Sequence, residues 1–351
     1  MTPVDAPRHV VIGRDEAGWC DRFVSALETR AASDPGLSWE IANLEAHDWL
    51  DAVRSASHVV WNPGYMGPVS ASLFKERVFF LENYLGMRVM PNYRSVWHFE
   101  SKIAQSYLFT FAGARTPATV VSLDHDDAVS AVAELGIPVV IKESFGASSE
   151  NVELLRTPGA IRSRIDRLFR QQLWDRAKRG AGSSWRAVPK VVLRPWFWGK
   201  VAQVVSGDER VGRLYAQEFV AGNDADLRVT VVGSRAVAFW RHNRENDFRA
   251  SESGLLDYDR PVPADVVRMC MELSRQLGFD SMAYGILFRG NESLVVEMSY
   301  NYLDDAVHNA PGSWRRSASG DVVFELGQVW PEELWIEHLL DYRIDVSQSA
   351  H

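Results

Sequence analysis

The 351-residue chain contains few cysteines, no long apolar run and no excess of positive charge. Its two cysteines, Cys20 and Cys270, are too few and too isolated for a disulfide framework or a zinc site, which favours a reducing compartment. The N-terminal residues lack the charged start and apolar core of a signal peptide, and no apolar stretch reaches membrane-spanning length. We therefore expect a soluble, cytoplasmic protein.

The balance of charge argues against nucleic acid as the main partner. The chain has 38 Lys and Arg residues against 46 Asp and Glu residues, which gives a formal net charge of −8. Proteins that bind duplex DNA or RNA usually carry an excess of positive charge. The hydrophobic fraction of 46% is typical of a globular protein, and the length allows two or three domains.

The N-terminal part of the sequence alternates short apolar runs with helical patterns. Helices are predicted at 19–32 and 73–86, where apolar residues recur at helical spacing. Strands are predicted at 9–13, at 39–44, from 57 into a Pro-Gly turn, and from 87 to a stop at Pro91. This βαβ order predicts an α/β domain over residues 1–95, with a parallel sheet and helices on its faces. Neither GxGxxG nor GxxxxGK[ST] occurs there, so neither a dinucleotide-binding motif nor a P-loop is indicated.

The rest of the chain predicts helices followed by antiparallel strands. Helices are expected at 101–114 and 126–136, and the strand PVVIK follows at 138–142. Residues 161–190 are strongly basic and predict an amphipathic helix, either with a solvated basic face or as an anion-binding lid. From residue 191 strand patterns return, and helices are expected at 263–277 and from about 331.

Two lysines and one loop are candidates for phosphate binding. Lys142 ends the apolar strand PVVIK, so its stem can lie on the core while its ammonium group reaches phosphate oxygens; a surface lysine is the alternative. Lys102 is the second candidate. The segment SFGASS, which includes Ser148, has small side chains that leave backbone amides accessible to phosphates.

The strand RLYAQEFV, at 213–220, precedes a glycine-containing turn and is a candidate hinge between two subdomains. The backbone there could bind the adenine edge of a nucleotide. Asp224 or Asp226 would then accept hydrogen bonds from ribose hydroxyls. The residues of the candidate adenine site are Gln217, Glu218, Phe219 and Val220.

Glu297 stands near the end of the apolar strand VVEMSYN. A buried carboxylate is costly unless it is paired or bound to a cation, so Glu297 is expected either to bind Mg²⁺ together with phosphates or to form a salt bridge with an arginine. Arg241 and Arg249, in the stretch RHNRENDFRASESG, can neutralise charge on a transferring phosphoryl group or an acyl phosphate.

In their order along the chain, these segments resemble the ATP-grasp superfamily. The resemblance implies an ATP-grasp fold with an N-terminal domain at 1–95 and two subdomains, at 96–215 and 216–351, that clasp ATP. DFRAS is similar to glutamate ligases that modify a ribosomal protein, whereas EMSYN, NAPGSW and WPEELWIEHLL are similar to a bacterial group associated with glycan or secondary-metabolite pathways. The matching segments are FESKIAQSYLFTFAGARTPAT, PVVIKESFGASSENV, YAQEFVAGNDADLRVTVVG, AFWRHNRENDFRASESG and LVVEMSYN.

The resemblance also implies an activity, in which ATP phosphorylates a carboxylate and an amine then attacks the acyl phosphate to form an amide. ATP and Mg²⁺ would be required, together with a small-molecule acid and amine. The implied roles are phosphate binding by Lys102, Lys142 and Ser148, adenine binding by Gln217, Glu218, Phe219 and Val220, ribose binding by Asp226, substrate and phosphoryl contacts by Arg228, Arg241 and Arg249, and metal binding by Glu297 with Ser299 or Asn301.

Two positions depart from the family pattern. Gly285 stands where an acidic metal ligand is usual, and Ser299 stands where an asparagine is usual, so a second Mg²⁺ does not follow from the sequence. A kinase-like phosphotransferase and a nucleotide-binding scaffold without catalysis stay open as alternatives. The segment RPWFWGK is expected either to pack in the core or to bind an acceptor, and a homodimer is the default expectation.

Overall fold

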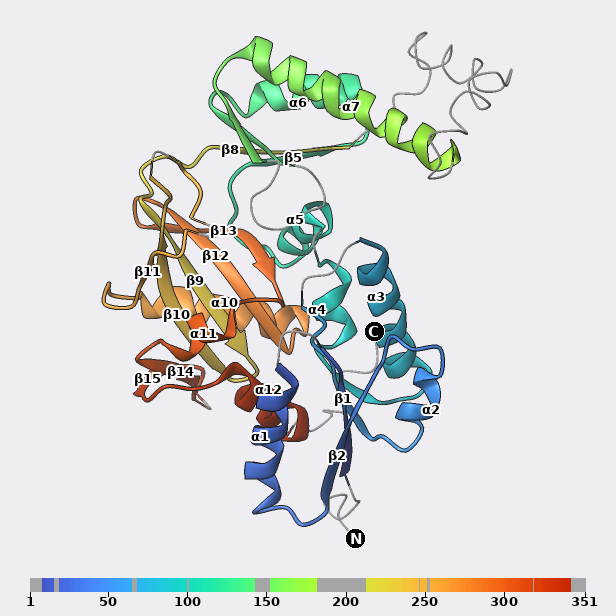
Figure 1. The fold of residues 1–351 in the computed structure, drawn as a ribbon. Helices are drawn as coiled ribbons and strands as arrows, with labels where there is room; N and C mark the ends of the chain where they lie inside the picture. The colour runs from blue at the N-terminus through green and yellow to red at the C-terminus, as the bar shows by residue number, and fades with distance from the viewer. Residues whose placement is uncertain are drawn as a thin grey trace.

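The computed structural model of the chain (Figure 1) forms three β-sheets with flanking helices. Within the part that it describes, no helix combines the length and the apolar character needed to cross a membrane. The described residues are 8–15, 19–64, 68–99, 101–142, 152–181, 213–245, 247–250, 253–317 and 319–341.

The N-terminal sheet is parallel, as the sequence predicts, with strand order β2-β1-β3-β4. Its central residues Val11, Ile12 and Val59 are fully buried, because helices cover a parallel sheet and its strands become continuous apolar runs. The elements are β1 (Arg8–Gly13), α1 (Trp19–Ala31), β2 (Leu37–Ala42), α2 (Trp49–Val53), β3 (His58–Val60), α3 (Pro68–Asn83), β4 (Arg88–Met90) and α4 (Tyr93–Trp97).

The second sheet is antiparallel, with order β5-β8-β6-β7, and the helices α6 and α7 share an apolar core with it (Figure 1). Helix α6 begins after Asp124, whose carboxylate accepts hydrogen bonds from two backbone N–H groups of the first turn. The elements are α5 (Lys102–Phe111), β5 (Thr119–Ser122), α6 (His125–Glu134), β6 (Val139–Lys142), β7 (Val152–Leu155), α7 (Pro158–Ala181) and β8 (Leu214–Glu218).

The basic segment predicted as a helix is helical up to Ala181. Two of its arginines serve the fold, because Arg164 and Arg167 both pair with Glu153 of β7, at 2.7 and 3.1 Å. The rest of that segment, and the strands expected at 191–212 with RPWFWGK, lie outside the described residues.

The third sheet is the largest and is antiparallel, with order β13-β12-β9-β10-β14-β15 and β11 beside β10. The hairpin β14–β15 and the short helix α11 were not predicted. The elements are β9 (Ala225–Val232), β10 (Arg235–His242), β11 (Leu256–Asp257), α10 (Ala264–Leu277), β12 (Ser281–Arg289), β13 (Glu292–Ser299), α11 (Asp304–His308), β14 (Gly312–Arg316), β15 (Val322–Leu326) and α12 (Pro331–Asp341).

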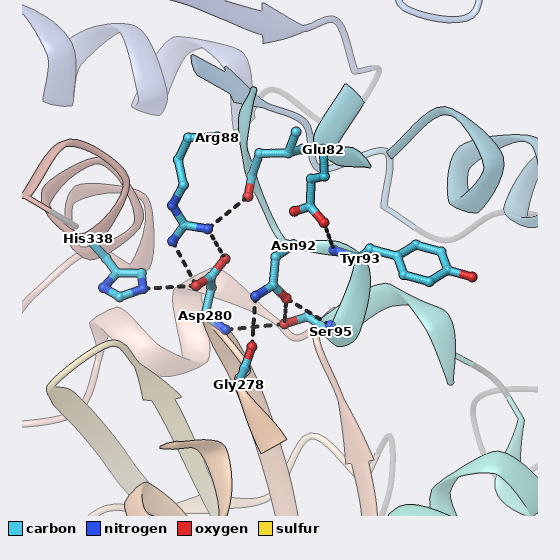
Figure 2. A network of polar contacts seen from close by, with 9 residues as sticks. Glu82, Arg88, Asn92, Tyr93, Ser95, Gly278, Asp280 and His338 are labelled. Atoms are coloured by element: carbon cyan, nitrogen blue, oxygen red, sulfur yellow. Dashed lines mark hydrogen bonds and ion pairs between the residues drawn. The ribbon is translucent and has the colours of Figure 1, made fainter. Parts of the chain in front are cut away.

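Buried polar contacts join the N-terminal sheet to the largest sheet (Figure 2). Arg88 of β4 donates two hydrogen bonds to the carboxylate of Asp280, at 2.7 and 2.8 Å, and His338 of α12 contacts the same carboxylate at 3.0 Å. Asn92 donates to the carbonyl oxygen of Gly278 at 2.7 Å. One apolar core also runs through both sheets, so they pack as one body; the domain limits at 95 and 215 stay predictions.

Candidate active site

A cavity of about 280 Å³ is lined both by the second sheet, through β6 and β8, and by the largest sheet, through β9, β10 and β13. It brings together thirteen of the fourteen residues selected from the sequence. Ser148, the fourteenth, lies outside the described residues. The thirteen are Lys102, Lys142, Gln217, Glu218, Phe219, Val220, Asp226, Arg228, Arg241, Arg249, Glu297, Ser299 and Asn301.

The cavity lining is basic although the chain as a whole is acidic. The lining contains five lysine and arginine side chains and three acidic ones, whereas the whole chain carries a formal net charge of −8. A concentration of positive charge in a concave site favours an anionic ligand. Of the two candidate ribose ligands, only Asp226 lines the cavity; Asp224 is 72% exposed and pairs with Arg260.

Strand register places the central charged groups side by side. Arg228 of β9 pairs in register with Gly285 of β12, which in turn pairs with Glu297 of β13. Asp226 lies opposite Arg241 of β10. Because side chains two residues apart on a strand point to the same face, Asp226 and Arg228 share one face of the sheet.

Asp226, Arg241, Glu297 and Arg228 form a continuous chain of contacts. Arg241 donates to both carboxylate oxygens of Asp226, at 2.8 and 2.6 Å, and to Oε1 of Glu297 at 3.2 Å. Arg228 donates to the same Oε1 at 3.3 Å. Of the two roles expected for Glu297, the structure shows the salt bridge with arginines. The Glu297 side chain is nevertheless 44% exposed, because it faces the cavity.

The pKa values of these groups follow from burial and from their neighbours. Burial raises the pKa of the Glu297 carboxyl, but Arg241, Arg228 and Lys142 outweigh it and lower that pKa to about 2. Burial and then Arg241 lower the pKa of Arg228 to about 10. Burial also lowers the pKa of Arg241, but Asp226 reverses the effect and leaves it above the ordinary arginine value. At neutral pH Glu297 is thus an anion between cations.

Gly285 provides the space that the Glu297 side chain occupies. A Cβ atom at Gly285 would lie 2.8 Å from Cγ of Glu297, closer than van der Waals contact allows. The register between β12 and β13 also shifts between Gly285 and Ile286. A side chain at position 285 would collide with Glu297, and this packing constraint explains the glycine.

Lys142 reaches into the cavity from the end of β6. Its ammonium group donates to Oε1 of Gln217 at 2.7 Å, and Gln217 donates to Thr119 at 3.1 Å. Burial and the proximity of Lys102 lower the pKa of Lys142, while Glu297 raises it, and the result is about 8. Gln217 thus holds the lysine through its side chain, a role that was not predicted.

At the end of β8, where a hinge was predicted, two of three successive backbone N–H groups are bonded and, within the described part of the chain, one is open. The backbone N–H groups of Glu218 and Phe219 donate to Ala118 and Pro138, at 2.9 and 3.3 Å. Among the described residues we find no acceptor for the N–H of Val220. The Glu218 carboxylate accepts from the backbone N–H of Ala118 at 2.7 Å, so its side chain ties the end of β8 to the residue before β5.

Comparisons with known proteins place this geometry in a known fold. No protein-family model and no curated protein matches the chain. A RimK domain ATP-grasp protein from Sphaerobacter thermophilus matches with a TM-score of 0.56 and 14% identity, over 85% of this chain and 93% of that one. The chain has the ATP-grasp fold.

Two further ATP-grasp structures agree with this assignment. A RiPP-associated ATP-grasp ligase from Chryseobacterium gregarium matches with a TM-score of 0.55 and 13% identity, over 86% of this chain and 92% of that one. D-alanine–D-alanine ligase from Bacillus anthracis matches with a TM-score of 0.50 and 12% identity, over 84% of this chain and 86% of that one. The likeness concerns the fold and does not confirm the resemblance to a glycan-associated group.

The oxygen ligands at the centre of this ATP-grasp cavity fit one Mg²⁺ ion. Both arginines contact Oε1 of Glu297, and among the described residues Oε2 has no hydrogen-bond donor. Ser299 donates to the carbonyl oxygen of Asn301 at 2.7 Å and accepts from its N–H, so this hydroxyl also shapes the turn. The described residues contain no cluster of three acidic, His or Cys ligands. Such a set suits an ion that shares phosphate and water ligands.

Several cavity residues of this ATP-grasp fold were missed by the sequence analysis. Asn223 joins the turn after β8 to β12, since its side chain donates to the carbonyl of Phe288 at 3.0 Å and accepts from its N–H at 2.9 Å. Gln105, 7% exposed on α5, accepts from the N–H of Met298 at 3.3 Å. A polar residue on the apolar face of a predicted helix could have indicated Gln105, whereas Asn223 stands in a turn where polar residues are ordinary.

Proposed function

We propose that the chain is an ATP-dependent carboxylate–amine ligase. The observation that carries the proposal is the cavity between the two sheets, where two lysines and three arginines lie in the lining with the half-exposed carboxylate of Glu297. Such a set suits a triphosphate and the charge that develops on a transferring phosphoryl group. The fold supports the proposal, because two of the matched proteins are ligases, one in complex with ATP and the other with ADP and a peptide.

ATP would lie across the hinge. The open N–H of Val220 would donate to the adenine ring, and Phe219 and Phe248, whose rings meet edge to face at 5.8 Å, line the cavity beside it. Asp226 would accept from a ribose hydroxyl in addition to its bonds from Arg241, since each carboxylate oxygen has two lone pairs. Lys102 and Lys142 would bind the phosphates.

The arginines would bind and orient the acid. Arg241 is held by both oxygens of Asp226, so its guanidinium direction is fixed before any ligand arrives. Arg228 and Arg249 would complete the contacts to the substrate carboxylate and the γ-phosphate. Mg²⁺, held by Oε2 of Glu297 beside Ser299 or Asn301, would supply charge neutralisation on the phosphates.

The proposed reaction has two steps. A carboxylate oxygen of the acid attacks the γ-phosphorus of ATP, and ADP leaves. A neutral amine then attacks the acyl carbon, phosphate leaves with the former acid oxygen, and the amine gives up a proton. Acids and amines of amino-acid or peptide type are the first candidates, because the matched ligases act in D-alanine and peptide chemistry according to their names.

The proposal predicts that Glu297→Gln lowers ADP release at least about 100-fold, because the neutral amide can neither balance Arg228 and Arg241 nor ligate a hard cation as a carboxylate does. ADP release would be measured with panels of acids and amines. Glu292→Gln, on the same strand but away from the cavity lining, serves as the matched control and should retain activity.

Three outcomes separate the candidate functions. ADP release that needs both an acid and an amine supports the ligase. ADP release at full rate without amine, with a stable phosphorylated acid, would replace the ligase by a kinase-like phosphotransferase. Tight ATP binding without Mg²⁺ dependence, and without turnover on either panel, would indicate a scaffold.

A further inference from the structure

A second, much smaller hollow lies where α1 and α12 meet the segment that follows β13. Its volume of about 10 Å³ is close to the least that can hold one water molecule, and an ammonium group is of similar size. Trp19 and Phe23 of α1 and Trp335 of α12 line it, together with Tyr300 and Tyr302 from the segment after β13. Most of the lining is therefore aromatic.

The charge of this hollow is opposite to that of the large cavity. Its charged lining residues in the described part of the chain are both acidic, Asp304 and Glu332. Asp304 is already engaged, because it pairs with Arg22 and accepts a hydrogen bond from Nε1 of Trp19 at 3.2 Å. Glu332 differs in this respect.

Glu332 is a buried acid with an unused oxygen. The residue is only 4% exposed, and its buried Oε2 has no hydrogen-bond partner among the described residues. Arg22 lies 4.0 Å from the other oxygen, but that guanidinium also contacts Asp304 and Asp305. Because a buried polar atom normally has a partner, ionised or protonated, this oxygen calls for a donor or acceptor from outside the fold.

We propose that the hollow binds a single primary ammonium group. Burial raises the pKa of the Glu332 carboxyl to about 7, and in its ionised form this group supplies a charge-assisted acceptor for ammonium. Aromatic side chains also stabilise a cation that has lost part of its water. The small volume of the hollow favours such a group over a bulkier quaternary one.

The position of the hollow connects it with the candidate active site. Tyr300 and Tyr302 line the hollow, while Ser299 and Asn301 of the same segment line the large cavity. A ligand group held at Glu332 is thus one chain segment away from the place where ATP would bind. That the ammonium group belongs to the amine substrate rests on the proposed ligase function; that the hollow binds ammonium does not.

The test uses thermal unfolding of the full chain without ATP, in methylammonium chloride and in sodium chloride of equal ionic strength. At tenfold over its Kd, methylammonium should raise the Tm of the wild-type protein by about 2 °C relative to sodium. The same shift is expected for Glu333→Gln, the matched control on the exposed side of α12. Glu332→Gln should lose the shift, because the amide keeps the shape and removes the charge.

Size selectivity in the wild-type protein keeps the test decisive if Glu332→Gln does not fold. Tetramethylammonium is too large for the hollow and should stabilise the protein no more than sodium does. Equal shifts in all three proteins, or equal shifts with both ammonium ions, would overturn the proposal and leave a hollow that holds water. Since neither ATP nor turnover is measured, this failure would be separate from failure of the ligase proposal.

Discussion

Four side chains at the centre of the cavity alternate in charge, in the order Asp226, Arg241, Glu297 and Arg228. An isolated charge in such a place would be costly, but each member has an oppositely charged neighbour, which offsets the loss of water. The arrangement also explains why Glu297 stays ionised with a pKa of about 2. Ionisation of this group therefore does not limit ligand binding at neutral pH.

Lys142 is a cavity group whose charge changes near physiological pH. Its pKa of about 8 means that the ammonium form, which would bind phosphate, decreases as the pH rises through 8. We expect ATP affinity, measured by isothermal titration, to fall between pH 7.5 and 9.5 by up to about tenfold per pH unit above the pKa. Lys142→Arg keeps the charge and should remove this dependence. Identical pH profiles for the two proteins would contradict the role of Lys142.

At the scale of secondary structure, strand pairing determines where these groups lie. Arg228, Gly285 and Glu297 lie in one row across β9, β12 and β13, so the middle strand must lack a side chain where the Glu297 carboxylate crosses it. Gly285 thus leaves the space in which the Glu297 side chain lies. Its neighbours on the same strand, Tyr284 and Ile286, are fully buried and hold the strand in place.

The substitution Gly285→Ala tests whether the Glu297 side chain depends on the gap at Gly285. The added methyl group would contact the Glu297 side chain, so we expect a loss of about 1–3 kcal/mol in the free energy of unfolding and a reduced rate of ADP release. Urea denaturation and the ADP assay measure the two effects. Gly159→Ala on α7, where a Cβ atom meets nothing within 4 Å, is the control. An unchanged stability and rate for Gly285→Ala would show that Glu297 does not depend on this gap.

At the scale of the whole molecule, the N-terminal sheet and the largest sheet are held together by an apolar core and by the contacts of Asp280 (Figure 2). Asp280 is 3% exposed and receives donors from β4 and α12. Burial raises its pKa, but His338 and Arg88 outweigh burial and lower it. The carboxylate therefore joins two parts of the chain that are distant in sequence.

Asp280→Ala should destabilise the protein by about 3–5 kcal/mol, because it leaves the Arg88 guanidinium buried without its carboxylate. Urea denaturation of the full chain measures this change. Asp51→Ala removes an exposed carboxylate, 73% exposed and paired with Arg54, and should cost less than about 1 kcal/mol. Equal losses for the two variants would mean that the contacts in Figure 2 stabilise the protein no more than an exposed ion pair does.

The parts of the fold that the sequence predicted are those with strong local patterns. The strands of the N-terminal sheet are apolar runs, and α10 carries apolar residues at helical spacing with Gly278 at its end. The hairpin β14–β15 was not predicted although its second strand is a short apolar run, VVFEL, and in the structure Val323, Phe324 and Leu326 of this run are exposed. Exposed apolar residues on a sheet edge cannot be distinguished from a buried strand without knowledge of their neighbours.

The sequence by itself indicated several of the chemical groups in the cavity, because a lysine at the end of a strand, closely spaced arginines and an acid in an apolar run are visible one residue at a time. Only the tertiary structure decided how these groups pair. Whether Glu297 meets arginines, why Gly285 is a glycine and where Glu332 points all depend on register and packing between segments far apart in the chain. Local sequence carries the preference of each segment, whereas contacts between distant segments arise only when the sheets assemble.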